Sequence, residues 1–179
     1  MWDGWVEIEK PHTHIIGHWN YKNGVKKHIY VVSSAEKVEL FLNGKSLGFG
    51  EQSSRFLYTL KNVEWQPGEL KAVGYDKNGK RITQDVKKTV GEPVAIKLTQ
   101  RTSPNGLTAN GNDIALVDVE AVDKDGNRNP IALNLISFEL SGEAEWRGGI
   151  AQGKDNYILS KNLPIENGVN RVLLRSTTK

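Results

Sequence analysis

The fold is decided by residues 38–48, which read Val38-Glu39-Leu40-Phe41-Leu42-Asn43-Gly44-Lys45-Ser46-Leu47-Gly48. The residues before the Asn-Gly pair are apolar or aromatic in the pattern of a strand, without the three- or four-residue spacing of a helix. Asn and Gly both tolerate positive φ, so this pair closes a tight turn between flanking strands. The stretch therefore predicts a β-hairpin that pairs residues 38–42 with residues 46–50.

The same strand pattern recurs along the whole chain, and short turns separate the strands. Asn78-Gly79 and Asp125-Gly126 are further turn dipeptides, and the first of them joins residues 70–75 to residues 80–86 in a second predicted hairpin. Other predicted strands span residues 28–32, 56–60, 94–98, 114–122, 135–140 and 170–175. With no convincing amphipathic helix between them, these strands indicate an all-β sandwich.

A domain boundary is expected near Gly91-Glu92-Pro93, because a fresh strand begins directly after it. The chain has 179 residues, which suits two small domains of about 90 residues each. We therefore predict two tandem immunoglobulin-like β-sandwich domains. Residues 1–91 comprise a linker and the first sandwich, and residues 92–179 form the second, which we expect to be truncated at its C-terminus.

Composition excludes several classes of function. The 24 basic and 21 acidic residues are interspersed, so no basic tail or stripe predicts nucleic-acid binding. No apolar run approaches the length of a membrane-spanning helix, which is about 20 residues. The chain has no cysteine, so disulfides, thiolate metal sites and cysteine nucleophiles are excluded. No Gly-rich loop has phosphate-binding spacing, and we expect no cofactor.

Two clusters have residue types that can bind a metal ion. Asp123-Lys124-Asp125-Gly126-Asn127 has oxygen ligands spaced by two around a glycine, as in a calcium loop. With Gly126 at the sixth loop position, however, Ala121 and Ala132 occupy the first and twelfth positions, where carboxylates are required. A plain hairpin turn is therefore the favoured interpretation, and no metal ligand is predicted there.

The second cluster consists of His12, His14 and His18. On a strand His12 and His14 share a face, but His18 lies beyond Gly17 and has no defined direction relative to them. No carboxylate motif completes a site. Hydrogen bonding against a neighbouring domain is the favoured interpretation.

A catalytic role is disfavoured. Glu143 and Glu145 would share one face of a strand, as a glycosidase pair could, but catalytic carboxyls usually come from different elements at the mouth of a pocket. Neither Ser33-Ser34 nor Ser53-Ser54 lies in a nucleophile-elbow pattern. No catalytic residue is predicted.

The tryptophans are the most informative residues for binding. Trp2, Trp5 and Trp19 crowd the first 20 residues, and they either cover the first sandwich or bury against a domain outside this sequence. Trp65 and Trp146 each precede a turn, where an exposed ring could stack on a sugar. Packing is the favoured role for each ring, with carbohydrate contact as the alternative.

Several stretches together resemble the region after the catalytic barrel in family 2 glycoside hydrolases of the β-galactosidase type, notably those of Bacteroides-like bacteria. In the first domain these are His14-Ile15-Ile16-Gly17-His18-Trp19-Asn20, residues 38–48 and Pro67-Gly68-Glu69-Leu70-Lys71-Ala72-Val73-Gly74-Tyr75. In the second domain, residues 91–98, 113–127 and 138–142 resemble the next, invasin-like or bacterial immunoglobulin-like domain of the same enzymes. The resemblance covers nearly the whole chain.

The resemblance implies a parent enzyme that hydrolyses a β-galactoside or related β-glycoside with retention, using two glutamates of a barrel that is not in this sequence. No catalytic residue can be carried over, so the chain itself is expected to be inactive. Residues 1–5 would be the tail of the barrel's last helix and linker. After residues 172–179, family members usually continue into a closing strand, so the second sandwich would show an unpaired edge. A periplasmic or secreted location is likewise implied.

Three functions follow as expectations. The first is a non-catalytic accessory region that braces the catalytic barrel during carbohydrate degradation; the others are a carbohydrate-binding module and a pair of adhesive Ig-like surface domains. For contact with the barrel the candidates are Trp2, Trp5, His14, His18 and Trp19. For contact with a polysaccharide they are Trp65 and Trp146.

Overall fold

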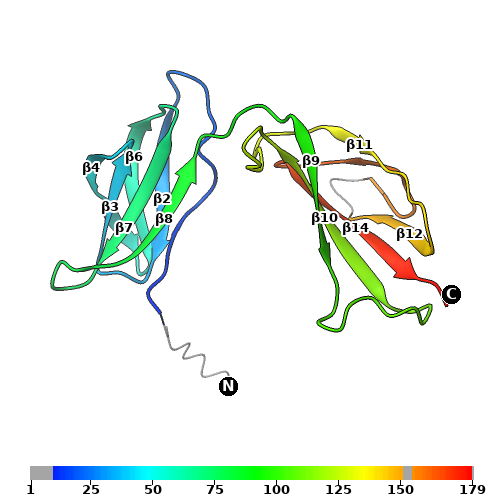
Figure 1. Ribbon diagram of the computed structural model, residues 1–179. Coiled ribbons are helices and arrows are strands. Elements are labelled where there is room, and N and C mark those ends of the chain that lie inside the picture. The colour runs from blue at the N-terminus through cyan, green and yellow to red at the C-terminus, as the bar shows by residue number, and fades with distance from the viewer. Residues whose placement is uncertain (1–9, 151–154, 179) are drawn as a thin grey trace. The chain divides into compact units, whose positions relative to one another are not determined.

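The computed structural model describes residues 10–150 and 155–178 (Figure 1). The chain divides into two compact units, Met1–Thr89 (unit 1) and Val90–Lys179 (unit 2). Every regular element among the described residues is a β-strand, and the strands pair antiparallel. The all-β prediction is confirmed. The described residues contain no helix able to cross a membrane.

Unit 1 is a sandwich of two four-stranded sheets, with strand orders β1-β2-β6-β5 and β4-β3-β7-β8. Its core draws buried side chains from both sheets, including Ile15 and Val31 from the first and Leu40 and Ala72 from the second. The two orders match the A-B-E-D and C′-C-F-G sheets of an immunoglobulin-like fold. The strands are β1 (Thr13–Ile15), β2 (Lys26–Ser33), β3 (Lys37–Leu42), β4 (Lys45–Phe49), β5 (Glu51–Ser54), β6 (Leu57–Glu64), β7 (Glu69–Tyr75) and β8 (Arg81–Lys88).

Both predicted hairpins of unit 1 are present. β3 pairs with β4 across Asn43 and Gly44, whose φ angles of 51° and 81° are those of a type I′ turn. β7 pairs with β8 across a turn that Asp76 organises, because its Oδ1 accepts the backbone N–H groups of Asn78 (2.8 Å) and Lys80 (2.9 Å). The turn residues therefore act as their local chemistry predicts.

Unit 2 has one large sheet and one small one. The large sheet has the order β12-β14-β10-β9, and the small sheet pairs only β11 with β13. Leu163 of β13 is fully buried against Val119 and Val172 of the large sheet, so the two sheets enclose a core. The strands are β9 (Ala95–Arg101), β10 (Ile114–Val122), β11 (Leu135–Ser137), β12 (Ala144–Gly149), β13 (Asn162–Pro164) and β14 (Val169–Ser176).

The small sheet does not extend over β9. Ile96 and Leu98 pair with the buried positions Ala121 and Val119 of β10, yet they are 44% and 61% exposed. Alternation places them on the core side of the large sheet, where they remain partly exposed. The last strand, β14, is not an edge, because it lies between β12 and β10. Truncation of the second sandwich at its C-terminus stays a prediction.

Candidate docking surface

The five residues predicted to contact another domain have different environments. Trp2 and Trp5 lie outside the described residues. Trp19 is only 1% exposed and belongs to the hydrophobic core of unit 1. Its ring is thus already covered by unit 1, which agrees with the interpretation that this tryptophan packs on the first sandwich. His14 and His18 both retain exposed surface.

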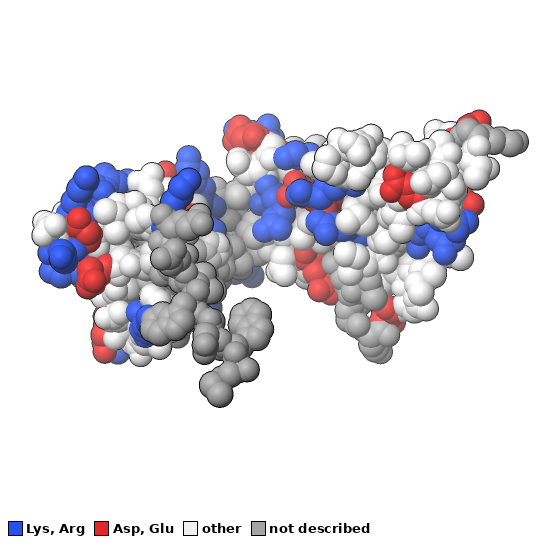
Figure 2. Space-filling view, turned by 90° about the horizontal axis from the view of Figure 1, so that it is seen from below, with Lys and Arg blue, Asp and Glu red and all other residues white. Residues whose placement is uncertain are grey.

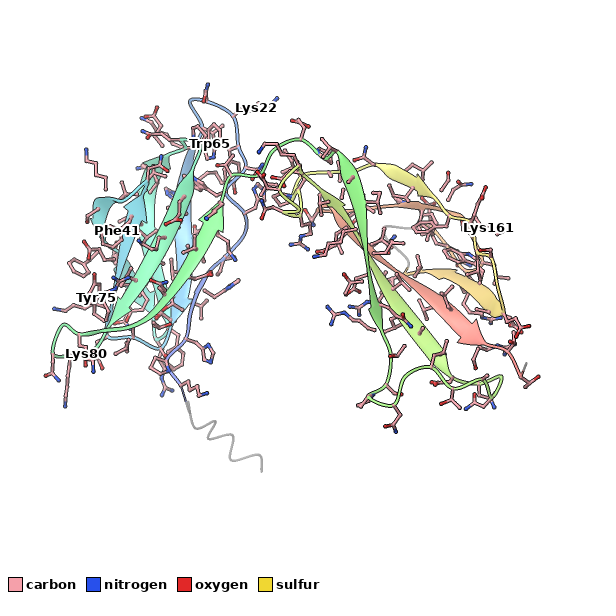
Figure 3. All side chains as sticks on the ribbon, viewed as in Figure 1. Lys22, Phe41, Trp65, Tyr75, Lys80 and Lys161 are labelled. Carbon is pink, nitrogen blue, oxygen red and sulfur yellow. The ribbon has the colours of Figure 1, made fainter. Side chains whose placement is uncertain are left out.

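Trp19 is held by hydrogen bonds at the end of unit 1 where Trp65 lies (Figure 3). The indole Nε1 of Trp19 donates to the carbonyl oxygen of Gln66 (3.0 Å), and Trp65 Nε1 donates to the carbonyl oxygen of Trp19 (3.1 Å). The Thr89 hydroxyl donates to the same Trp19 oxygen (3.0 Å). The two rings therefore join the leading segment to the β6–β7 connection, and the Trp19 carbonyl oxygen joins it to the residue after β8.

The outward side of β1 and β2 carries an exposed apolar strip, which we call the β1–β2 outer face and define as His14, Ile16, Tyr30 and Val32. His14 pairs with Val32 in the strand register, and the Ile16 N–H donates to the Tyr30 carbonyl oxygen (2.9 Å). Ile16, Tyr30 and Val32 are 51%, 41% and 43% exposed. All four side chains therefore share one face.

Strand β2 is apolar on both sides, which is unusual for a sheet with one side in water. Ile29 and Val31 are buried in the core, while Tyr30 and Val32 between and beyond them point outward. Antiparallel sheets with one solvated face normally alternate apolar with polar residues, and continuous apolar runs are typical of strands covered on both faces. Contiguous exposed apolar surface marks interaction sites. The β1–β2 outer face therefore has the properties of a docking surface.

His18 belongs to an aromatic cluster next to this face. Its ring stacks on Tyr21 with centroids 4.6 Å apart, and the Lys27 ammonium lies 5.1 Å from the centroid of the Tyr21 ring. Burial, with Lys27 as the smaller cause, lowers the pKa of His18, so its imidazole is neutral at pH 7. A hollow of about 440 Å³ connects the cluster to the outer face and is lined by Ile16, Tyr21, Lys26, Lys27, His28, Tyr30 and Asn62.

Strand β1 is itself held in position from the opposite sheet. The Asp85 carboxylate of β8 accepts the Ile15 N–H (2.8 Å), and His14 Nδ1 lies 3.5 Å from the same oxygen. His14 remains 65% exposed despite this contact. A side chain of β8 therefore fixes the edge strand that presents His14 and Ile16.

The two tryptophans predicted to contact carbohydrate are partly buried. Trp65 packs on the core of unit 1, with its Nε1 bonded to Trp19 as described. Trp146 packs on Phe138 with ring centroids 5.3 Å apart, and its Nε1 donates to the Ser160 carbonyl oxygen (2.8 Å). Both indole N–H groups are used inside their own units. Sugar stacking on these rings stays a prediction.

The aspartate-rich turn after β10 has the hydrogen bonds of a hairpin turn. Asp123 Oδ1 accepts the backbone N–H groups of Asp125 and Asn127 (both 2.9 Å), and Oδ2 accepts that of Gly91 (3.2 Å). These bonds, led by that from Asn127, lower the pKa of Asp123. Asp123 thus plays the part that Asp76 plays in the β7–β8 turn. Among the described residues, no group of three or more His, Asp or Glu side chains could hold a metal ion.

The outward side of the large sheet of unit 2 carries a charged network centred on Asp118. Its side chain is 11% exposed, and one carboxylate oxygen accepts Arg171 Nε while the other accepts Arg101 Nε. Hydrogen bonds from Arg171 and then Arg101 lower the pKa of Asp118. Figure 2 shows basic and acidic side chains interspersed over the face turned to the viewer.

We expect unit 2 to lose stability in acid through this carboxylate. Because folding lowers the pKa of Asp118, its stabilising contribution is full above the unfolded value of about 3.9 and is lost as the pH falls through the lowered pKa. Thermal unfolding of the wild type and of Asp118→Asn between pH 6 and pH 2 measures this. The difference in unfolding temperature between the two proteins should narrow below pH 4. A constant difference would contradict the stabilising role assigned to the Asp118 carboxylate.

Sequence reasoning missed Ile16, Tyr30 and Val32 as site residues. The signal was present, because Ile29-Tyr30-Val31-Val32 is an apolar run without alternation. The charged network was not detectable, since Arg101, Asp118 and Arg171 are brought together only by the pairing of β9, β10 and β14.

Comparisons with known proteins match both units. Residues 24–83 match a family described as a domain of unknown function, DUF4982. Residues 96–179 match the family described as Glycoside hydrolase family 2 C-terminal domain 5. Each match lies inside one unit.

Longer relatives match most of the chain in sequence. A β-glucuronidase of Formosa agariphila is 44% identical over 168 residues, which are 93% of this chain and 17% of that protein. A β-galactosidase of Bacteroides ovatus is 34% identical over 149 residues, 83% of this chain and again 17% of the relative. The chain thus spans about a sixth of the length of these curated relatives.

Solved structures of related enzymes have the same fold. A β-glucuronidase from glycoside hydrolase family 2 superposes with a TM-score of 0.91 at 43% identity, covering 95% of this chain and 18% of that chain. A family 2 member from Bacteroides cellulosilyticus gives 0.87 at 29% identity, with 96% and 26% coverage. In sequence and in fold, the chain is similar to the C-terminal accessory region of family 2 glycoside hydrolases, and its residues 96–179 belong to the C-terminal domain 5 family of these enzymes.

Proposed function

We propose that the chain is a non-catalytic accessory region that braces the catalytic domain of a family 2 glycoside hydrolase through the β1–β2 outer face. The observation that carries the proposal is the exposed apolar strip of Ile16, Tyr30 and Val32 on a sheet whose other side is already a core. The relatives, of whose length the chain spans about a sixth, include a β-glucuronidase and a β-galactosidase, so the parent substrate would be a β-glycoside of this kind.

The chemistry of the face fits a domain interface better than an active site. Three of its four residues, Ile16, Tyr30 and Val32, are aliphatic or aromatic, and the neutral imidazole of His18 lies beside the face. Apolar surfaces of this kind gain free energy by losing contact with water. Burying three half-exposed side chains would contribute about 1 kcal/mol each. The similarity to glycosidases of Bacteroidetes supports a periplasmic or secreted location, which we include in the proposal.

The proposal is tested in a chimera in which this chain replaces the matching region of the Formosa agariphila β-glucuronidase. The triple variant Ile16→Ser, Tyr30→Ser, Val32→Thr should lower the temperature of activity loss by about 5 °C or more, because the docked face loses its apolar contacts. KM for an aryl β-glucuronide should be unchanged, since bracing acts on the stability of the catalytic domain.

Two controls make the result interpretable. Phe49→Ser removes a 57% exposed apolar side chain from β4, in the other sheet of unit 1, and should leave the inactivation temperature unchanged. The isolated chain carrying the triple substitution should unfold at the wild-type temperature, because the substituted side chains point away from its core. If the triple variant of the chimera behaves like Phe49→Ser, this face does not brace the enzyme.

A further inference from the structure

The outward side of β9, β10 and β14 forms a shallow hollow of about 530 Å³ in unit 2. Strand register places Thr99, Asp118 and Arg171 in one cross-strand row and Lys97 and Glu120 in the next. The volume is within the range of small-molecule sites, about 300–1,000 Å³. The described lining residues are Lys97, Thr99, Arg101, Asp118, Glu120, Arg128, Ile150, Val169, Asn170 and Arg171.

The hollow has more positive than negative charge. Lys97 Nζ lies 3.7 Å from the Glu120 carboxylate, so these two charges compensate each other. Arg101 and Arg171 share the single carboxylate of Asp118, which leaves one guanidinium charge uncompensated. Arg128 adds a fourth cation, for which the structure shows no ion pair with the described residues. Two positive charges therefore remain in the hollow for an anion to neutralise.

The two shared guanidinium groups are oriented but not saturated. Each donates to Asp118 through Nε, and the structure shows no acceptor among the described residues for the Nη atoms of either. Asp118 is nearly covered, whereas the side chains of Arg101 and Arg171 are 61% and 37% exposed. Pairs of N–H groups on a fixed guanidinium plane match the oxygens of a carboxylate or a sulfate.

The remaining lining favours a saccharide over other anions of similar size. The Thr99 hydroxyl faces the same side, and the structure shows no hydrogen bond from it to another described residue, so it can bond a sugar hydroxyl. Ile150, 48% exposed, offers an apolar wall for sugar C–H groups. No aromatic side chain is among the described lining residues, so neither a nucleic-acid base nor a neutral sugar would find a ring to stack on.

We propose that this hollow binds an anionic saccharide, with the guanidinium groups of Arg101 and Arg171 holding a carboxylate or sulfate group of the sugar. The choice of a saccharide rests on the proposed function, but the site lies in unit 2 and does not involve the β1–β2 outer face. In the parent enzyme it would hold an acidic polysaccharide close to the catalytic domain.

Isothermal titration of the 179-residue chain tests the proposal, with tetragalacturonate, a sulfated galactan tetrasaccharide and neutral galactotetraose as probes. At least one anionic probe should bind with a Kd of about 1 mM or below, and the neutral probe should bind at least about tenfold more weakly. The two anionic probes distinguish a carboxylate site from a sulfate site. Equal binding of the neutral probe, or no binding of either anion, would overturn the proposal.

A charge-conserving variant distinguishes specific binding by the guanidinium groups from non-specific electrostatic attraction. The double variant Arg101→Lys, Arg171→Lys keeps the net charge and leaves Asp118 paired with a cation. It removes the planar guanidinium groups that can donate two parallel hydrogen bonds to one anion, so the affinity for the anionic probe should fall by about tenfold. Lys80→Gln removes one exposed charge from a turn of unit 1 and should bind as the wild type does. Wild-type affinity in the double variant, or an equal loss in Lys80→Gln, would show non-specific electrostatics instead. The docking test in the chimera is unaffected by either result.

Discussion

Substitution of Trp19 by alanine should destabilise unit 1 by about 3–5 kcal/mol, the range for removing a large aromatic side chain from a core. The ring is 1% exposed, so the substitution leaves a cavity that the surrounding strands cannot easily fill. It also removes the donor that the Gln66 carbonyl oxygen accepts. Urea unfolding followed by circular dichroism measures the loss, and the transition of unit 2 should remain where it was.

Phe49→Ala is the matched control for this substitution. Phe49 also contacts an aromatic side chain, Tyr75, at a centroid distance of 6.1 Å, but it is 57% exposed. Its removal should therefore cost well under half as much as that of Trp19. If Trp19→Ala unfolds at nearly the same urea concentration as the wild type, the tryptophan contributes little to the core, and its ring would again be a candidate for contact with another domain.

Gly168→Ala should be the most damaging single-methyl change in unit 2, at about 3 kcal/mol or more. Gly168 has a φ of +73°, and a Cβ there would overlap the carbonyl oxygen of Asn129. The loop cannot move aside cheaply, because the Gly168 N–H donates to the Ala132 carbonyl oxygen (3.0 Å) and its own carbonyl oxygen accepts the Ala121 N–H (2.9 Å). Thermal unfolding of the purified variant measures the effect.

Gly126→Ala isolates the conformational part of that cost. Gly126 has a similar φ of +79°, but a Cβ there would meet nothing within 4 Å. The loss should be about 1–2 kcal/mol, the cost of a left-handed conformation for an alanine. Equal losses at the two glycines would mean that the Asn129 backbone yields and that the overlap at Gly168 contributes nothing.

Hairpins were predictable because their determinants are local. Asn43-Gly44 and the turn that begins at Asp76 carry the necessary backbone preferences within four residues, and the alternating strands follow directly from them. Ile114–Val122 is long and apolar enough to be identified with its observed bounds. Such segments specify their structure without information from distant parts of the chain.

Other features depend on contacts that a single sequence does not display. β5 (Glu51–Ser54) is wholly exposed and polar, so no hydrophobic pattern announces it, and pairing with β6 alone makes it a strand. β1 and β13 have three residues each, which is too short for periodicity. Burial of Trp19 depends on Trp65, Gln66 and Thr89, between 46 and 70 residues away in sequence.

The separate cores of the two units bear on how such enzymes diversify. Thr89 is hydrogen-bonded to Gly68 and Trp19 of unit 1, and Gly91 is hydrogen-bonded to Asp123 and Asn129 of unit 2. The chain therefore passes from one unit to the other within three residues. Recombination of genes at this junction would transfer an intact sandwich without opening either hydrophobic interior. If both proposals hold, a catalytic domain could thereby exchange the unit that binds an anionic saccharide during evolution while it keeps the unit that braces it.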